Sequence, residues 1–178
     1  ELWNESALAV EDATRAAMLL EPVAIAASAQ RTAAHGVYSN DPAHGVRLLT
    51  PTMKRLIRAS DESLDIIAKR ITDKDSIKEL GAAVRGGSDV RAVVGRHSTA
   101  RSLERLAKRH VDVALHAGSP YVHANVILGR GTSGAEMAYA GTAYLSRRTQ
   151  AHEKANRPSR EMGVLIDDPQ HPAQLREW

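Results

Sequence analysis

The sequence predicts an α/β fold: a mixed, mostly parallel sheet flanked by helices on both faces. Its 178 residues are the length of one domain with a proper core. From residue 46 onward, short apolar runs of strand length alternate with segments whose apolar residues recur at helical spacing. Strands separated by helices require crossover connections, which align the strands in parallel and lay the helices on the faces of the sheet.

The first 45 residues differ from the rest. We expect residues 1–45 to be a helical connection from a preceding segment, and residues 46–178 to form the α/β domain. Residues 4–34 are rich in alanine and predict two helices that meet at Pro22, because proline disfavours helical geometry in the residue before it. The stretch Ser39–Pro42 predicts a turn or linker. The chain begins at Glu1 rather than at Met, so we expect that a further part of the protein precedes it.

Local signals place the elements that follow. Pro51 suits the first turn of a helix. Thr72-Asp73 caps a second helix, which ends at Gly86-Gly87, and Ser98 or Thr99 caps a third. Residues 111–115 alternate between apolar and polar, as a half-buried strand does. The expected strands are residues 46–50, 64–68, 90–94, 111–115, 122–128, 137–140 and 162–166.

The composition excludes several classes of protein. With no cysteine, the chain has no disulfide framework, no thiolate zinc site and no cysteine nucleophile. No apolar stretch reaches the length of a transmembrane helix. The net charge of +3 suits an anionic partner without identifying one. The compartment is left open, because any signal peptide would have preceded residue 1.

Common catalytic and cofactor motifs are missing or out of context. The Gly129-x-Gly131-x-x-Gly134 spacing fits a dinucleotide-binding pattern, but the segment after it is strand-like and opens no helix, so we expect a hairpin loop. No pair of histidines has the spacing of a zinc-binding helix, and no Gly-x-Ser-x-Gly nucleophile elbow occurs. We therefore expect no metal and no cofactor.

A basic stripe marks one expected helix. Arg101, Arg105 and Arg109 recur every four residues, opposite the apolar side of that helix. We interpret the stripe as a solvated face on which Glu104 pairs with Lys108. Binding of nucleic acid is the alternative, although the few aromatic residues offer little surface for base stacking.

One histidine stands apart from the others. His123 lies in an apolar strand pattern, and the next strands carry Gly141-Thr142 and Glu161. From the pattern alone, His123 is either a packed core residue or a nucleophile held by a carboxylate.

The order of segments from Arg47 to Pro169 resembles one half of a phospholipase D superfamily enzyme. Tyr121-Val-His-Ala, followed by Val-Ile-Leu, resembles the start of the His-x-Lys-x4-Asp signature of that family. Gly141-Thr-Ala-Tyr-Leu-Ser resembles its GSxNLS strand, and Arg160-Glu-Met-Gly-Val-Leu-Ile-Asp-Asp-Pro resembles its NRExGxxIxDP ending. The opening Glu1-Leu-Trp-Asn-Glu is similar to the connection that leaves the first half of a tandem member, so the chain resembles a C-terminal half.

This chain departs from the family pattern at four positions. The signature lysine is Asn125 and the signature aspartate falls at Arg130. The asparagine of the GSxN strand is Tyr144, and the asparagine before Arg160-Glu161 is Ser159. His123 and Glu161 are kept, and Thr142 replaces a serine with another hydroxyl.

The resemblance implies metal-independent phosphodiester chemistry with a phosphohistidine intermediate. It assigns catalysis to His123 and Glu161, and substrate binding to Asn125 and Thr142. The family uses two histidines, so the resemblance implies a partner half, either an N-terminal segment of the same protein or a homodimer mate. The substrate would be a phosphodiester, in a phospholipid or a nucleic acid. The alternative is a degenerate, non-catalytic half that serves as a scaffold or as an anion- or nucleic-acid-binding module.

Overall fold

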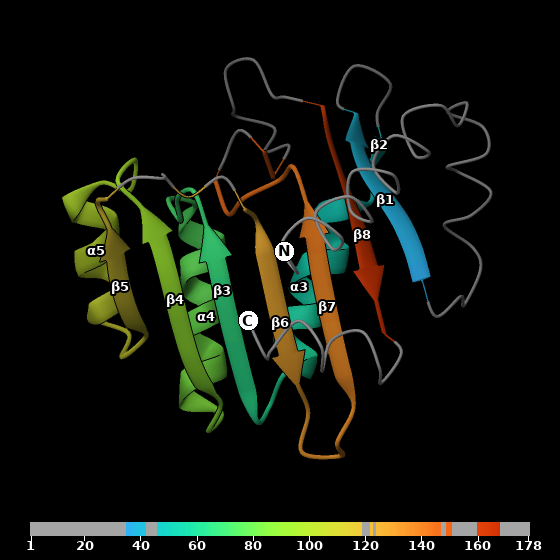
Figure 1. Cartoon of the computed structure of the whole chain (residues 1–178). Coiled ribbons are helices and arrows are strands. Elements are labelled where there is room, and N and C mark those ends of the chain that lie inside the picture. Colours follow the sequence, from blue (N-terminus) through green and yellow to red (C-terminus); the bar gives the residue numbers. More distant parts are fainter. Residues whose placement is uncertain are drawn as a thin grey trace, which may run out of the picture.

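The computed structural model describes residues 35–41, 46–118, 122, 124–146, 149–150 and 160–167. These residues form one sheet with the strand order β2-β1-β8-β7-β6-β3-β4-β5 (Figure 1). The strands are β1 (His35–Asp41), β2 (Val46–Arg47), β3 (Ser63–Ala68), β4 (Asp89–Gly95), β5 (Asp112–His116), β6 (Val126–Arg130), β7 (Glu136–Gly141) and β8 (Glu161–Ile166). The described helices are α3 (Leu49–Ala59), α4 (Lys74–Arg85) and α5 (Ala100–Ala107).

The mixed α/β fold is confirmed, but the balance of strand directions differs from the prediction. The pairs β3–β4 and β4–β5 are parallel, because α4 and α5 carry the chain back between them. The other five pairs in the described sheet are antiparallel. The prediction of a mostly parallel sheet assumed a helical crossover between successive strands. However, β6 and β7 are joined by a tight hairpin, which can connect only antiparallel strands.

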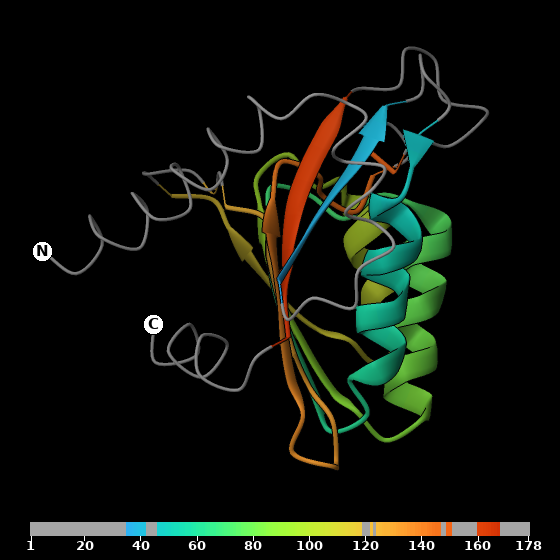
Figure 2. The ribbon, with the colours of Figure 1, turned by 90° about the vertical axis from the view of Figure 1, so that its right-hand side faces the viewer.

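All three described helices lie on one face of the sheet (Figure 2). The part of the chain that the structure describes does not test the prediction of helices on the second face. None of these three helices is long and apolar enough to cross a membrane.

Two helices begin at the predicted caps. The side chain of Asp73 accepts the backbone N–H of Ser76 at 2.8 Å, and that of Thr99 accepts the N–H of Ser102 at 3.2 Å. In contrast, α3 begins at Leu49, two residues before Pro51, and has no side-chain cap. The strand predicted over residues 46–50 is therefore reduced to the two residues of β2.

The prediction of a turn or linker at Ser39–Pro42 is wrong for the residues described there. Residues 35–41 form β1, which pairs along its length with β8 in the same sheet as the later strands. Asn40 is fully buried and donates hydrogen bonds to the Thr50 hydroxyl at 2.9 Å and to the Thr149 carbonyl at 3.0 Å. The division of the chain at residue 45 is otherwise untested, because residues 1–34 lie outside the described part.

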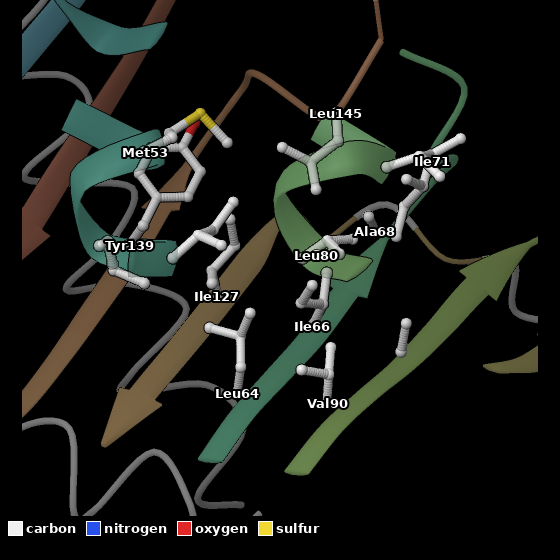
Figure 3. Close-up of a cluster of buried hydrophobic side chains, with 14 of the residues drawn as sticks. Met53, Leu64, Ile66, Ala68, Ile71, Leu80, Val90, Ile127, Tyr139 and Leu145 are labelled. Atoms are coloured by element: carbon white, nitrogen blue, oxygen red, sulfur yellow. The ribbon is translucent and has the colours of Figure 1, made fainter. Parts of the chain in front are cut away.

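The core lies between the sheet and its helices (Figure 3). Along β3, Leu64, Ile66 and Ala68 are buried toward the helices, while the residues between them are more exposed. In a chain without phenylalanine, Tyr139 of β7 is the bulkiest fully buried side chain among the described residues. Its hydroxyl donates to the Ala143 carbonyl at 3.0 Å, and burial raises its pKa above the usual range.

Candidate active site

The candidate residues that the structure describes meet at one edge of the sheet. This edge comprises the last residues of β3, β4, β5 and β7 and the first residues of β6 and β8, and we call it the Asn125 edge. Asn125 directly precedes β6, Thr142 directly follows β7, and Glu161 begins β8. Strand pairing therefore brings together three positions that the sequence separates by up to 36 residues.

Asn125 joins the ends of two strands. Its Nδ2 lies 3.3 Å from each of the carbonyl oxygens of Gly141 and Thr142, and its Oδ1 lies 3.4 Å from the backbone nitrogen of Lys69. A carboxamide has two N–H donors, and both are directed at the backbone here. The side chain at the position of the family's lysine thus stabilises the edge itself.

Thr142 holds Glu161. The Thr142 hydroxyl donates to Oε2 of Glu161 at 2.6 Å, a short distance typical of a hydrogen bond to a carboxylate. The same hydroxyl oxygen accepts the backbone N–H of Met162 at 3.0 Å. These two bonds fix the carboxylate of Glu161 at the start of β8.

His123 and Ser159 lie outside the described residues, so the structure does not test their predicted roles. In the sequence, His123 comes two residues before Asn125, and Ser159 comes two residues before Glu161. Both predictions concern segments that lead directly into the Asn125 edge.

Arg130 supplies no charge to this edge. It ends β6 at the opposite end of the sheet, where its Nε donates to Glu136 at 2.9 Å and its Nη1 donates to Glu62 at 3.3 Å. The resemblance aligns Arg130 with the signature aspartate of the family. The positive charge of Arg130 therefore pairs with carboxylates of β7 and of the segment before β3.

Tyr144 contacts a cation that no sequence pattern had singled out. Nη2 of Arg70 donates to the Tyr144 hydroxyl at 2.8 Å, and the guanidinium carbon lies 4.9 Å from the centroid of the tyrosine ring. Arg70 follows β3 by two residues, at the Asn125 edge. The sequence feature that could have pointed to Arg70 is the Lys69-Arg70 pair, which directly follows an apolar strand.

One small recess adjoins Asn125 and Tyr144. It is lined mainly by apolar side chains and has no room for a water molecule. Among the described residues, no group of three or more histidine and acidic side chains is arranged to hold a metal ion.

Two other motifs have the predicted local structure. The glycine-rich segment turns between β6 and β7, where the Gly131 N–H donates to Ala135 at 2.8 Å and Gly134 has a φ of 82°. On α5 and just beyond it, the Lys108 ammonium donates to the Glu104 carboxylate at 2.7 Å, and both side chains are mostly exposed. The expected hairpin and the expected i, i+4 pair are both present.

The fold of this chain is shared with proteins of known structure. No protein-family model matches the sequence, and no curated protein matches it. The structure is similar to Nuc from Salmonella typhimurium, a phospholipase D family member, with a TM-score of 0.64 and 18% identity over 80% of this chain and 89% of that one. NucT from Helicobacter pylori matches with a TM-score of 0.63 and 15% identity, over 80% of this chain and 91% of that one.

A larger solved protein contains the same unit. Phosphatidylserine synthase from Haemophilus influenzae matches with a TM-score of 0.59 and 16% identity, over 80% of this chain but only 37% of that one. The order of segments in the sequence predicts this fold, and these structural matches confirm the fold. The described chain has the phospholipase D superfamily fold.

Proposed function

We propose that this chain supplies one half of a metal-independent, phospholipase D-type site that acts on a phosphodiester. The observation that supports this most is the Thr142–Glu161 hydrogen bond, which holds a carboxylate at the sheet edge into which the His123 segment leads. In the sequence, His123 comes two residues before Asn125. A histidine that is oriented by a carboxylate can act as a nucleophile at phosphorus.

In the proposed reaction, a nitrogen of His123 attacks phosphorus and the bond to the leaving oxygen breaks. A histidine of the partner half gives its proton to that oxygen, and the product is a phosphohistidine. Water, or an alcohol in a transfer reaction, then gives a proton back to the partner histidine and attacks phosphorus, which breaks the P–N bond and releases His123. Glu161 would orient the imidazole and stabilise its positive charge, while Thr142 holds Glu161 in place.

The partner half is either an N-terminal segment of the same protein or a second copy of this chain. The structural matches support both arrangements, because the chain covers most of Nuc but about a third of phosphatidylserine synthase. Measuring the native mass of the purified chain separates them: a dimer that turns over substrate supports the homodimer, and an inactive monomer supports the tandem arrangement.

The test is hydrolysis of bis(4-nitrophenyl) phosphate, with and without EDTA, by the chain purified together with any preceding segment. We expect activity that survives EDTA and is lost in His123→Ala. The control is His110→Asn, which changes an exposed histidine with a φ of 59° between α5 and β5, at the opposite end of the sheet. Asparagine tolerates that conformation. Equal activity of His123→Ala and wild type, or activity abolished by EDTA, would contradict the proposal.

A second candidate is a non-catalytic half that serves as a scaffold or as an anion- or nucleic-acid-binding module. It is favoured by Asn125, a neutral side chain whose Nδ2 lies 3.3 Å from two backbone carbonyl oxygens. It predicts no turnover by the chain with any partner half, and unchanged activity of a co-expressed preceding half when His123 is replaced.

Phosphatidylcholine vesicles and single-stranded DNA, assayed in parallel, distinguish the two proposed substrate classes, a phospholipid and a nucleic acid.

A further inference from the structure

We propose that Arg70, held by Tyr144, is the cation that binds the phosphoryl group at the Asn125 edge. This inference rests on the proposed function for the identity of the ligand, a phosphodiester or phosphate oxyanion. The geometry of Arg70 itself is independent of any catalytic role for His123.

The tyrosine fixes the guanidinium at two points. The hydrogen bond from Nη2 to the Tyr144 hydroxyl is 2.8 Å long, and the guanidinium carbon lies 4.9 Å from the ring centroid. An arginine held over an aromatic ring loses less side-chain freedom when it binds a ligand. The remaining donors of the planar group are thus oriented before any anion arrives.

One of these donors needs an acceptor. Nε of Arg70 is buried, and in the described structure it has no hydrogen-bond partner. A buried N–H of a charged group that stays unpaired costs free energy, so native proteins usually supply a partner. An oxyanion is the acceptor that a guanidinium binds best, with two parallel N–H···O bonds.

Three other arginines of the described chain form ion pairs with acids. Arg58 pairs with Glu79 at 2.6 Å, Arg91 with Asp65 at 2.8 Å and Arg130 with Glu136 at 2.9 Å. No described carboxylate lies within salt-bridge distance of Arg70, whose polar contact is a neutral phenol. Its positive charge is therefore available to an anion.

Arg70 also lies close to the other candidate residues at the Asn125 edge. The backbone N–H of Lys69, the residue before it, points to Oδ1 of Asn125, and Tyr144 is two residues after Thr142. Two departures from the family pattern thus act together. Asn125 stands where the family has a cation and contacts the backbone, while Tyr144 stands where the family has an amide and holds Arg70, a cation from the segment after β3.

Binding of inorganic phosphate to the full chain, followed by NMR or calorimetry, tests this assignment directly. We expect Arg70→Gln to weaken binding at least tenfold, and Arg70→Lys to weaken it less, because lysine keeps the charge but not the fork. Tyr144→Leu, which leaves Arg70 in place but unheld, should also weaken binding. The matched control is Arg85→Gln at the end of α4, which removes an exposed charge at the opposite end of the sheet.

Two results would overturn the inference: Arg70→Gln that binds phosphate as well as wild type, or Arg85→Gln that weakens binding equally. Far-UV circular dichroism and the melting temperature of each variant separate loss of binding from loss of fold. If Arg70→Gln does not fold, Tyr144→Leu and Arg70→Lys decide the question, and unchanged binding in both overturns the assignment.

Turnover separates this inference from the proposed function. If both hold, His123→Ala abolishes hydrolysis but keeps phosphate binding, and Arg70→Gln lowers kcat/KM by about 10²-fold. If wild type binds phosphate through Arg70 but never hydrolyses a diester, the proposed function fails and the anion site stands. If hydrolysis depends on His123 but not on Arg70, the anion site fails and the proposed function stands.

Discussion

The Thr142 hydroxyl donates a 2.6 Å hydrogen bond to Oε2 of Glu161 while its oxygen accepts the backbone N–H of Met162 at 3.0 Å. The backbone N–H of Thr142 also donates to the Met162 carbonyl at 2.9 Å. The backbone and the side chain of Thr142 thus both bind Met162, and they join the end of β7 to the start of β8. The hydroxyl of Thr142 therefore helps to hold the Glu161 carboxylate in position.

Replacing Thr142 with valine removes this hydroxyl and keeps the shape of the side chain. A hydrogen bond to a charged group contributes about 1.5–3 kcal/mol, and the exposure of Thr142 places the effect at the lower end. We expect kcat for diester hydrolysis to fall by about tenfold, with KM little changed, because Glu161 would orient His123 rather than bind substrate. Thr142→Ser, which keeps the hydroxyl, is the control, and a valine variant as active as wild type would contradict this role.

Asn125→Ala should destabilise the fold, because it removes the bridge between the ends of β3 and β7. Each lost hydrogen bond contributes about 0.5–1.5 kcal/mol, and the three bonds are long, so we expect the free energy of unfolding to fall by about 1–3 kcal/mol. Urea denaturation measures it. Asn125→Lys, which introduces the family's residue, should lose the same three hydrogen bonds. If either variant is as stable as wild type, Asn125 does not stabilise the fold in this way.

The stability conferred by Asp61 should depend on pH. The Asp61 carboxylate accepts the Thr132 N–H at 2.7 Å and the Thr132 hydroxyl at 3.0 Å, and these bonds lower its pKa below the usual value. A carboxyl whose pKa is lower in the folded state stabilises the fold above its unfolded pKa, near 4, and loses that effect as pH falls through the folded value.

The measurement is urea denaturation of wild type and Asp61→Asn from pH 7 to pH 2. We expect the difference in stability to be constant above about pH 5 and to shrink below pH 4. The control is Asp167→Asn, which removes an exposed carboxylate just after β8. A difference that grows as pH falls would have the opposite sign and would refute the assignment.

Gly163 has no space for a side chain. A Cβ there would lie 2.2 Å from Cε2 of Tyr139, whose ring is fully buried in the core. We expect Gly163→Ala to lower the free energy of unfolding by about 1–3 kcal/mol, because a packed ring has nowhere to move. Gly118→Ala is the control, since its nearest neighbour beyond the adjacent residues is the His116 ring at 3.6 Å. Thermal denaturation of both variants decides the matter, and equal melting temperatures would disprove the clash.

Much of the local structure could be predicted from the sequence. The caps at Asp73 and Thr99, the alternation along β3 and the hairpin at Gly131–Gly134 each depend on residues close together in the chain. Such interactions leave a readable pattern, because a cap needs one side chain and a buried strand needs every second residue to be apolar. The family resemblance rested on short motifs of the same kind, and Asn125, Thr142 and Glu161 were named from them.

Tertiary structure alone decided the rest. β1 has no apolar alternation, and it is a strand because the free edge of β8, more than 120 residues later, supplies its hydrogen bonds. Asn125 directly precedes β6 and Arg130 ends it, yet only the sheet shows what each side chain contacts at the two ends of that strand. The contact of Arg70 with Tyr144 spans 74 residues. A pairing of this kind leaves no periodic signal, because it follows from which strands become neighbours rather than from the residues beside it.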